Sequence, residues 1–127
     1  MPSPCPCGLP RAYADCCGRW HSGPLRLQAQ DALALMRSRY CAFVRGDDVY
    51  LLETWHASTR PATPVITDQA TRWLGLEVRQ HAIQDADHAT VEFVARSKHG
   101  GRATRLHETS RFVRETGHWY YLDGEVH

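Results

Sequence analysis

Four of the five cysteines lie near the start of the chain, in a pattern that suits metal binding. Cys5 and Cys7 form one pair, Cys16 and Cys17 form the other, and eight residues separate the two pairs. Structural zinc takes four ligands in a tetrahedron, with thiolate sulfurs about 2.3 Å from the metal. The spacing therefore predicts one Zn²⁺ held by these four thiolates, with His21 as the alternative to Cys17 for the fourth position.

The alternatives for this cluster are two disulfides, or thiols that bind no metal. A disulfide between the neighbours Cys16 and Cys17 would be strained. The first residues also lack the basic and apolar regions of a secretory signal, so we expect a cytoplasmic protein whose cysteines bind metal. Because all four ligands are cysteines, no position is left for water or substrate, and the zinc is expected to be structural.

Length and charge indicate a small one-domain protein and argue against nucleic-acid binding and membrane association. The 127 residues are enough for one domain with a core and a small appendage. The net charge of +1 argues against binding to nucleic acid or to an anionic membrane. The longest apolar run, from Tyr40 to Val44, is far too short to span a bilayer.

Two helices are expected after the cysteine cluster. Apolar residues at helical spacing predict a long helix over 28–45, which Gly46 would end. Asp47 and Asp48 are typical caps for a second helix over 48–54, and a short helical turn is expected at 68–72. Cys41, within the long helix, is interpreted as a small buried apolar residue, with a reactive thiol as the alternative.

From Trp73 the hydrophobic period becomes two, which indicates strands. Leu74 and Leu76 are expected on one face of the first strand. Turns at 85–87, 99–101 and 116–117 predict a four-strand antiparallel meander. The whole pattern indicates an α+β fold with a curved sheet against the long helix, divided into a zinc knuckle at 1–22 and a domain at 23–127.

Several motifs resemble known families. The pattern Cys-x-Cys-Gly, then Tyr13, then Cys-Cys-Gly resembles the SEC-C motif, a zinc-binding motif named after the SecA translocation motor. Four segments are similar to the bacterial YchJ-like family: CCGRWH at 16–21, ALMRSRY at 34–40, TWHASTRP at 54–61 and GHWYYLDG at 117–124. The resemblance implies a nuclear transport factor 2-like cone, in which the sheet wraps around the long helix and leaves a pocket.

The pocket that this cone implies is a second candidate site. The residues expected to line it are Arg39, Trp55, His56, Glu108, Trp119 and Tyr121. A histidine and a carboxylate in an aromatic hollow can do acid–base chemistry when burial moves their pKa values toward neutrality. The structural alternatives are a hydrogen-bonded His56 and an ion pair of Glu108 with Arg39 or Arg111. Alternation also predicts that Trp119, Tyr121 and Asp123 share one face of the last strand.

The sequence favours an adaptor whose zinc knuckle contacts another protein, because the best-known SEC-C motif contacts a chaperone. The alternative is a small-molecule-binding or enzymatic cone with its pocket near Trp55, Glu108 and Trp119. No phosphate-binding loop, nucleophile elbow or H-E-x-x-H pair is present, so the sequence favours binding over catalysis.

Overall fold

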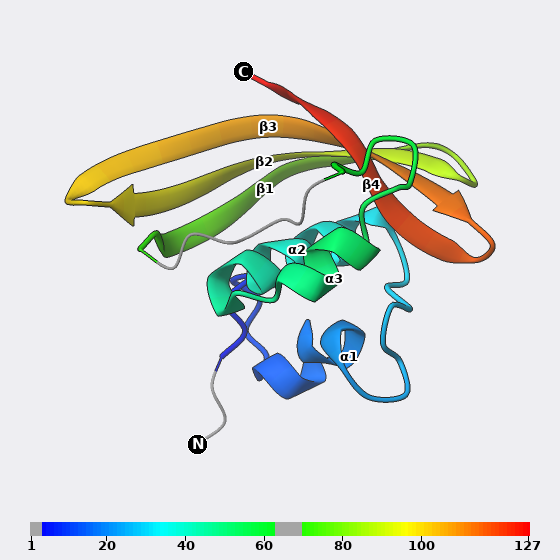
Figure 1. Cartoon of the computed structure of the whole chain (residues 1–127), viewed down its shortest axis with the longest axis horizontal. Helices are drawn as coiled ribbons and strands as arrows, with labels where there is room; N and C mark the ends of the chain where they lie inside the picture. The colour runs from blue at the N-terminus through cyan, green and yellow to red at the C-terminus, as the bar shows by residue number, and fades with distance from the viewer. Residues whose placement is uncertain (1–3, 63–69) are drawn as a thin grey trace.

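The computed structural model describes residues 4–62 and 70–127 of the chain. Helix α2 (Ala32–Arg45) runs under the concave face of a four-stranded antiparallel sheet, and α3 (Asp48–Glu53) packs beside it (Figure 1). The N-terminal segment, with the 3-10 helix η1 (Tyr13–Asp15) and helix α1 (Gly18–His21), lies on the side of α2 away from the sheet (Figure 1). Helix α2 is therefore the middle layer, between the sheet and the cysteine-rich segment.

The bounds of α2 follow from its two caps. Asp31 is extended, and its side chain accepts a hydrogen bond from the Ala34 N–H at 2.7 Å. Gly46 has a φ of 71° and donates to the last carbonyls, as expected for a left-handed C-cap. The predicted start at residue 28 was too early, because the cap at Asp31 fixes where the helix begins. Asp47 caps α3 by accepting from the Tyr50 N–H, as predicted.

The meander is confirmed, with its strands in the order β1-β2-β3-β4. The four strands are β1 (Arg72–Asp85), β2 (His88–His99), β3 (Arg102–Glu115) and β4 (His118–Val126). A bulge between Trp73 and Gly75 breaks the alternation expected for β1. Trp73 packs against the core, while Leu74 is 54% exposed, so Leu74 does not share a face with Leu76. Of the helical turn expected at 68–72, residues 68 and 69 lie outside the described residues, while 70–72 form no helix and Arg72 begins β1.

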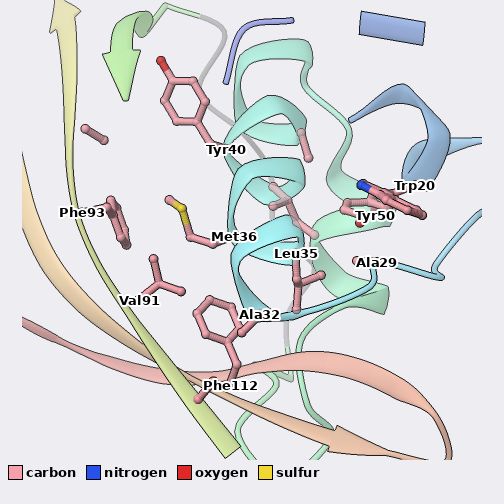
Figure 2. Close-up of a cluster of buried hydrophobic side chains, with 14 residues drawn as sticks. Trp20, Ala29, Ala32, Leu35, Met36, Tyr40, Tyr50, Val91, Phe93 and Phe112 are labelled. Atoms are coloured by element: carbon pink, nitrogen blue, oxygen red, sulfur yellow. The ribbon is translucent and has the colours of Figure 1, made fainter. Parts of the chain in front are cut away.

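The hydrophobic core surrounds α2 on two sides (Figure 2). On one side Leu35 packs with Tyr50 and Trp20, and on the other Met36 faces the strand residues Val91 and Phe93. Because both sides of α2 are buried, the helix joins the sheet to the N-terminal segment. No helix in the described part of the chain is long and apolar enough to cross a membrane.

Candidate metal centre and cone cavity

The four N-terminal cysteines form a compact buried cluster. One sulfur each from Cys5, Cys7, Cys16 and Cys17 lies within 4.8 Å of the other three. Four thiolates around a tetrahedral zinc would lie about 3.8 Å from one another, given a Zn–S distance of about 2.3 Å. The sulfurs of Cys7 and Cys16 are 3.8 Å apart. The donor set and its spacing therefore fit a four-coordinate zinc ion.

Local turns bring the two cysteine pairs together. The Cys5 N–H donates to the Arg11 carbonyl at 2.8 Å, which closes the loop between the pairs. Gly8, directly after Cys7, has a φ of 94°, a conformation that side-chain-bearing residues rarely adopt. The Cys16 N–H then donates to the Tyr13 carbonyl at 3.0 Å, at the end of η1. These bonds orient both pairs toward one point.

Polar contacts fasten this segment to α2. Arg37 donates from Nη1 to the Cys7 carbonyl at 2.9 Å. The guanidinium carbon of Arg45 lies 4.0 Å from the centre of the Tyr13 ring, a cation–π contact. The cluster is consequently packed against the helix and is buried on that side.

His21 takes a structural position next to the cluster. Its Nε2 lies 2.8 Å from the Ser38 carbonyl, so this nitrogen donates, and Nδ1 accepts from the Tyr13 hydroxyl at 2.5 Å. Burial lowers the pKa of His21, which keeps the ring neutral at neutral pH. Both ring nitrogens are engaged, and the metal-capable group found among residues 4–62 and 70–127 comprises the four cysteines without His21.

The thiols influence one another's ionisation. Hydrogen bonds from neighbouring thiols, with Cys17 the largest contributor, lower the pKa of Cys7. Burial raises the pKa of Cys16 to about 11. Cys7 is therefore expected to ionise before Cys16, and a divalent cation would be needed to hold Cys16 as a thiolate at neutral pH.

The fifth cysteine lies against this cluster, which the sequence did not reveal. Cys41 of α2 is fully buried, and its sulfur is 3.5 Å from that of Cys5. The expectation of a small buried residue is confirmed, but its neighbours are sulfurs as well as hydrocarbon. Cys41 is twenty-four residues beyond Cys17 along the chain, so no spacing rule linked it to the cluster.

Replacing Cys41 with alanine tests whether it is a ligand or a neighbour. We expect the variant to keep one zinc per chain, to bind it about tenfold more weakly, and to lose about 1 kcal/mol of stability. Metal analysis, competition with a chromophoric chelator and thermal unfolding measure these three quantities. Complete loss of zinc would show that Cys41 is itself a ligand.

A cavity of about 300 Å³ lies between α2 and the sheet. Four of the six residues expected there line it: Arg39, Trp55, Glu108 and Tyr121. Its other walls are mostly apolar and aromatic: Met36, Tyr40, Phe43, Trp73, Phe93, Ala95, Leu106, Ser110 and Phe112. A hollow of this size is at the lower end of the range for small-molecule sites.

His56 and Trp119 are not among the residues that line the cavity. His56 lies between Ser58 and Glu115, with 2.6 Å between its Nε2 and a Glu115 carboxylate oxygen. His56 is therefore a hydrogen-bonded structural residue, the alternative to a role in the pocket. The side chain of Trp119 packs at the edge of the core, with the Arg114 guanidinium 5.9 Å from its ring centre.

A bulge in the last hairpin separates residues that were expected on one face. Phe112 pairs with Tyr121, but Arg111 pairs with Asp123, so one residue of β4 is skipped. Tyr121 consequently faces the cavity, while Asp123 forms an ion pair with Arg111 on the exposed side. The simple alternation predicted for β4 was wrong for this reason.

Glu108 does not form the ion pair predicted for it. Its carboxylate accepts from the Ser110 hydroxyl at 2.5 Å, and Arg111 is taken by Asp123. Arg39 donates from Nη1 to the Leu51 carbonyl at 2.8 Å and to the Thr54 hydroxyl at 2.6 Å. Burial lowers the pKa of Arg39 to about 10, so it remains a cation at neutral pH.

A second hollow lies on the surface of the cysteine-rich segment. This knuckle groove has a volume of about 360 Å³ and is lined by Tyr13, Ala14, Gly18, Arg19, Ser22, Pro24 and Leu25. The Leu25 side chain is 48% exposed. Arg19 uses Nε to bond the Cys16 carbonyl, and its guanidinium carbon lies 4.5 Å from the centre of the Trp20 ring.

Two family models match the chain. The one described as "YchJ, middle NTF2-like domain" matches residues 31–124, and the SEC-C motif matches residues 1–19. A UPF0225 protein of Bordetella parapertussis is 59% identical over 125 residues, which cover 98% of this chain and 94% of that protein. A UPF0225 protein of Methylibium petroleiphilum is 62% identical over 125 residues, covering 98% and 90% respectively.

Two solved structures are similar to this one over nearly its whole length. The solution structure of a SEC-C motif containing protein from Rhodopseudomonas palustris has a TM-score of 0.82 and 33% identity, and covers 96% of this chain and 97% of that one. The crystal structure of a SEC-C motif containing protein from Psychrobacter arcticus has a TM-score of 0.79 and 31% identity, with coverage of 98% and 83%.

Proposed function

Because the chain belongs to the YchJ-like family, whose UPF0225 relatives it matches along nearly all its length, we propose that it is a cytoplasmic zinc-binding adaptor. One structural Zn²⁺, held by Cys5, Cys7, Cys16 and Cys17, orders a surface that contacts another protein. All four ligands are buried thiols, so the metal has no open position for substrate.

The observation that supports this role is the knuckle groove, the hollow lined by residues between Tyr13 and Leu25. Gly18 in its wall directly follows Cys17, and Tyr13 accepts the Cys16 N–H. The groove therefore depends on the turns that hold the two cysteine pairs. Zinc would stabilise these turns, because a segment this short gains most of its folding free energy from the metal.

The groove suits a short segment of a partner protein that carries an aliphatic side chain next to a carboxylate. Leu25 offers an exposed apolar contact at one wall. Arg19 bonds the Cys16 carbonyl through Nε, and within residues 4–62 and 70–127 its terminal nitrogens are left for the partner's carboxylate. The stacking of Arg19 on Trp20 holds the guanidinium in place and lowers the entropy lost on binding.

Leu25→Asp is expected to abolish partner capture while zinc binding and thermal stability stay at wild-type levels, because the side chain is exposed. Affinity purification from a bacterial lysate with quantitative mass spectrometry measures the loss. Val49→Asp is the matched control, since Val49 is 63% exposed on α3 and lies outside the groove. Equal recovery of partners by wild type and Leu25→Asp would refute the groove as the docking site.

The cone cavity favours a second candidate function, the binding of a small molecule. The cavity lies on the opposite side of α2 from the knuckle and contains the buried cation of Arg39. The adaptor test does not address it, because Leu25 and Val49 are both outside its walls.

A further inference from the structure

The polar groups of the cone cavity indicate which chemistry it accepts. Arg39 is only 7% exposed and lies in the cavity wall. Its side-chain hydrogen bonds to described residues both leave from Nη1, to Leu51 and Thr54 at the end of α3. In the part of the chain that the structure describes, no carboxylate is in ion-pair contact with it. The Nε and Nη2 groups of a buried guanidinium are therefore left for an acceptor.

Aromatic rings fix the orientation of this guanidinium. Its central carbon lies 4.6 Å from the centre of the Tyr121 ring and 5.6 Å from that of Trp55. The indole Nε1 of Trp55 is buried and has no hydrogen-bond partner among residues 4–62 and 70–127. Two side chains that line the cavity, Arg39 and Trp55, thus have donors that no described residue satisfies, and buried donors without partners are costly. A carboxylate, which binds side-on to Nε and Nη2 of arginine, matches them.

A carboxylate of the protein lies in the same cavity. Glu108 lines it from β3, and its Oε2 is held by the hydroxyl of Ser110, which is 2% exposed. This position depends on Gly124 of β4, where an added Cβ would lie 2.5 Å from Oε2 of Glu108. Glu108 is therefore a fixed acceptor for a ligand hydroxyl or ammonium group.

The remaining walls of the cavity indicate which side chain the ligand carries. Phe93, Leu106 and Phe112 of the sheet and Met36 of α2 give the cavity an apolar interior. We infer that the cone binds a small amino acid or hydroxy acid with an apolar side chain: its carboxylate on Arg39, its ammonium or hydroxyl group on Glu108, and its side chain among these residues. This inference gives a ligand class to the second candidate function and is independent of the adaptor role.

Calorimetric titration of the zinc-loaded protein tests the ligand class. The probes are phenylalanine, tryptophan, leucine and methionine, together with 3-phenyllactate, 3-phenylpropanoate and phenethylamine. We expect at least one amino acid, or 3-phenyllactate, to bind at micromolar to millimolar concentration. Relative to phenylalanine or 3-phenyllactate, 3-phenylpropanoate should bind about tenfold more weakly because it lacks the donor for Glu108, and phenethylamine should not bind. Binding of phenethylamine as strong as that of phenylalanine, or no binding by any acid of the panel, would overturn the proposal.

Variants of the polar residues distinguish specific binding through Arg39 and Glu108 from general hydrophobic binding in the cavity. Glu108→Gln should weaken the amino or hydroxy acid about tenfold and leave 3-phenylpropanoate unchanged. Gly124→Ala displaces the same carboxylate without removing its charge and should weaken binding similarly.

Arg39→Lys should weaken the binding of every acid by about tenfold or more, because lysine cannot form the side-on pair. Glu92→Gln is the matched control, since Glu92 is bound to His107 and does not line the cavity. If Glu108→Gln and Gly124→Ala bind as wild type does, the assignment fails even where Arg39→Lys is poorly folded.

Discussion

Cys17→Ser is expected to abolish zinc binding and to lower the stability of the whole chain, not only of the knuckle. Cys17 is 2% exposed and belongs to the four-sulfur cluster, so three thiolates would be left. Structural zinc contributes about 10–16 kcal/mol to the folding of small zinc domains. We expect more than about 4 kcal/mol of this to be lost here, which corresponds to a fall of about 12–20 °C in Tm for a chain of this size.

The effect reaches the domain because the knuckle covers α2. Arg37 bonds the Cys7 carbonyl and His21 bonds the Ser38 carbonyl, so a knuckle without metal leaves these groups without partners. Metal analysis by mass spectrometry and thermal unfolding by circular dichroism provide the two readouts, with Cys41→Ala as the matched thiol deletion. A Cys17→Ser protein that kept one zinc per chain would contradict the four-cysteine assignment.

Gly18→Ala is expected to damage the same centre without removing a ligand. A Cβ at this position would lie 2.7 Å from the Tyr13 carbonyl oxygen and 2.9 Å from a carbon of the Tyr13 ring. Because the first of these atoms belongs to the backbone, the turn that carries Cys16 and Cys17 would have to shift. Overpacking of this kind costs about 2–3 kcal/mol. We expect zinc affinity, measured by chelator competition, to fall by up to about 100-fold.

Gly75→Ala is the control for that change. Gly75 lies in β1, and no atom of the described residues stands within 4 Å of the Cβ that alanine would add. Zinc affinity in this variant should match that of the wild type. A similar loss of affinity in both glycine variants would mean that close packing of Gly18 on Tyr13 does not support the metal centre.

Both candidate functions depend on α2, which presents successive residues to different sites. Arg37 and the Ser38 carbonyl contact the knuckle, whereas Arg39 lines the cavity. The adaptor and the ligand-binding cone are therefore separable by variants at their surfaces, such as Leu25→Asp and Glu108→Gln. They are not separable by removing the metal, because that perturbs the helix they share.

Local sequence signals predicted most of the elements. The caps at Asp47 and Gly46 and the turns between strands are short-range features, in which a few residues determine the backbone. The clustering of the four cysteines was also expected from spacing alone, since a metal ion would need the two close pairs to meet across the short loop. For the same reason the resemblance to the SEC-C motif was visible in the sequence.

The tertiary structure decided what those signals could not. Cys41 lies beside Cys5 only because α2 packs against the knuckle, and Asp123 faces away from Tyr121 only because β4 contains a bulge. The ion pair expected between Glu108 and Arg111 does not form, because strand pairing places Asp123 opposite Arg111, and Glu108 instead bonds Ser110 on its own strand. The sequence by itself thus determined the four-cysteine cluster and the order of the elements, because these rest on neighbouring residues. The contents of the cavity were decided by contacts between residues far apart in the chain.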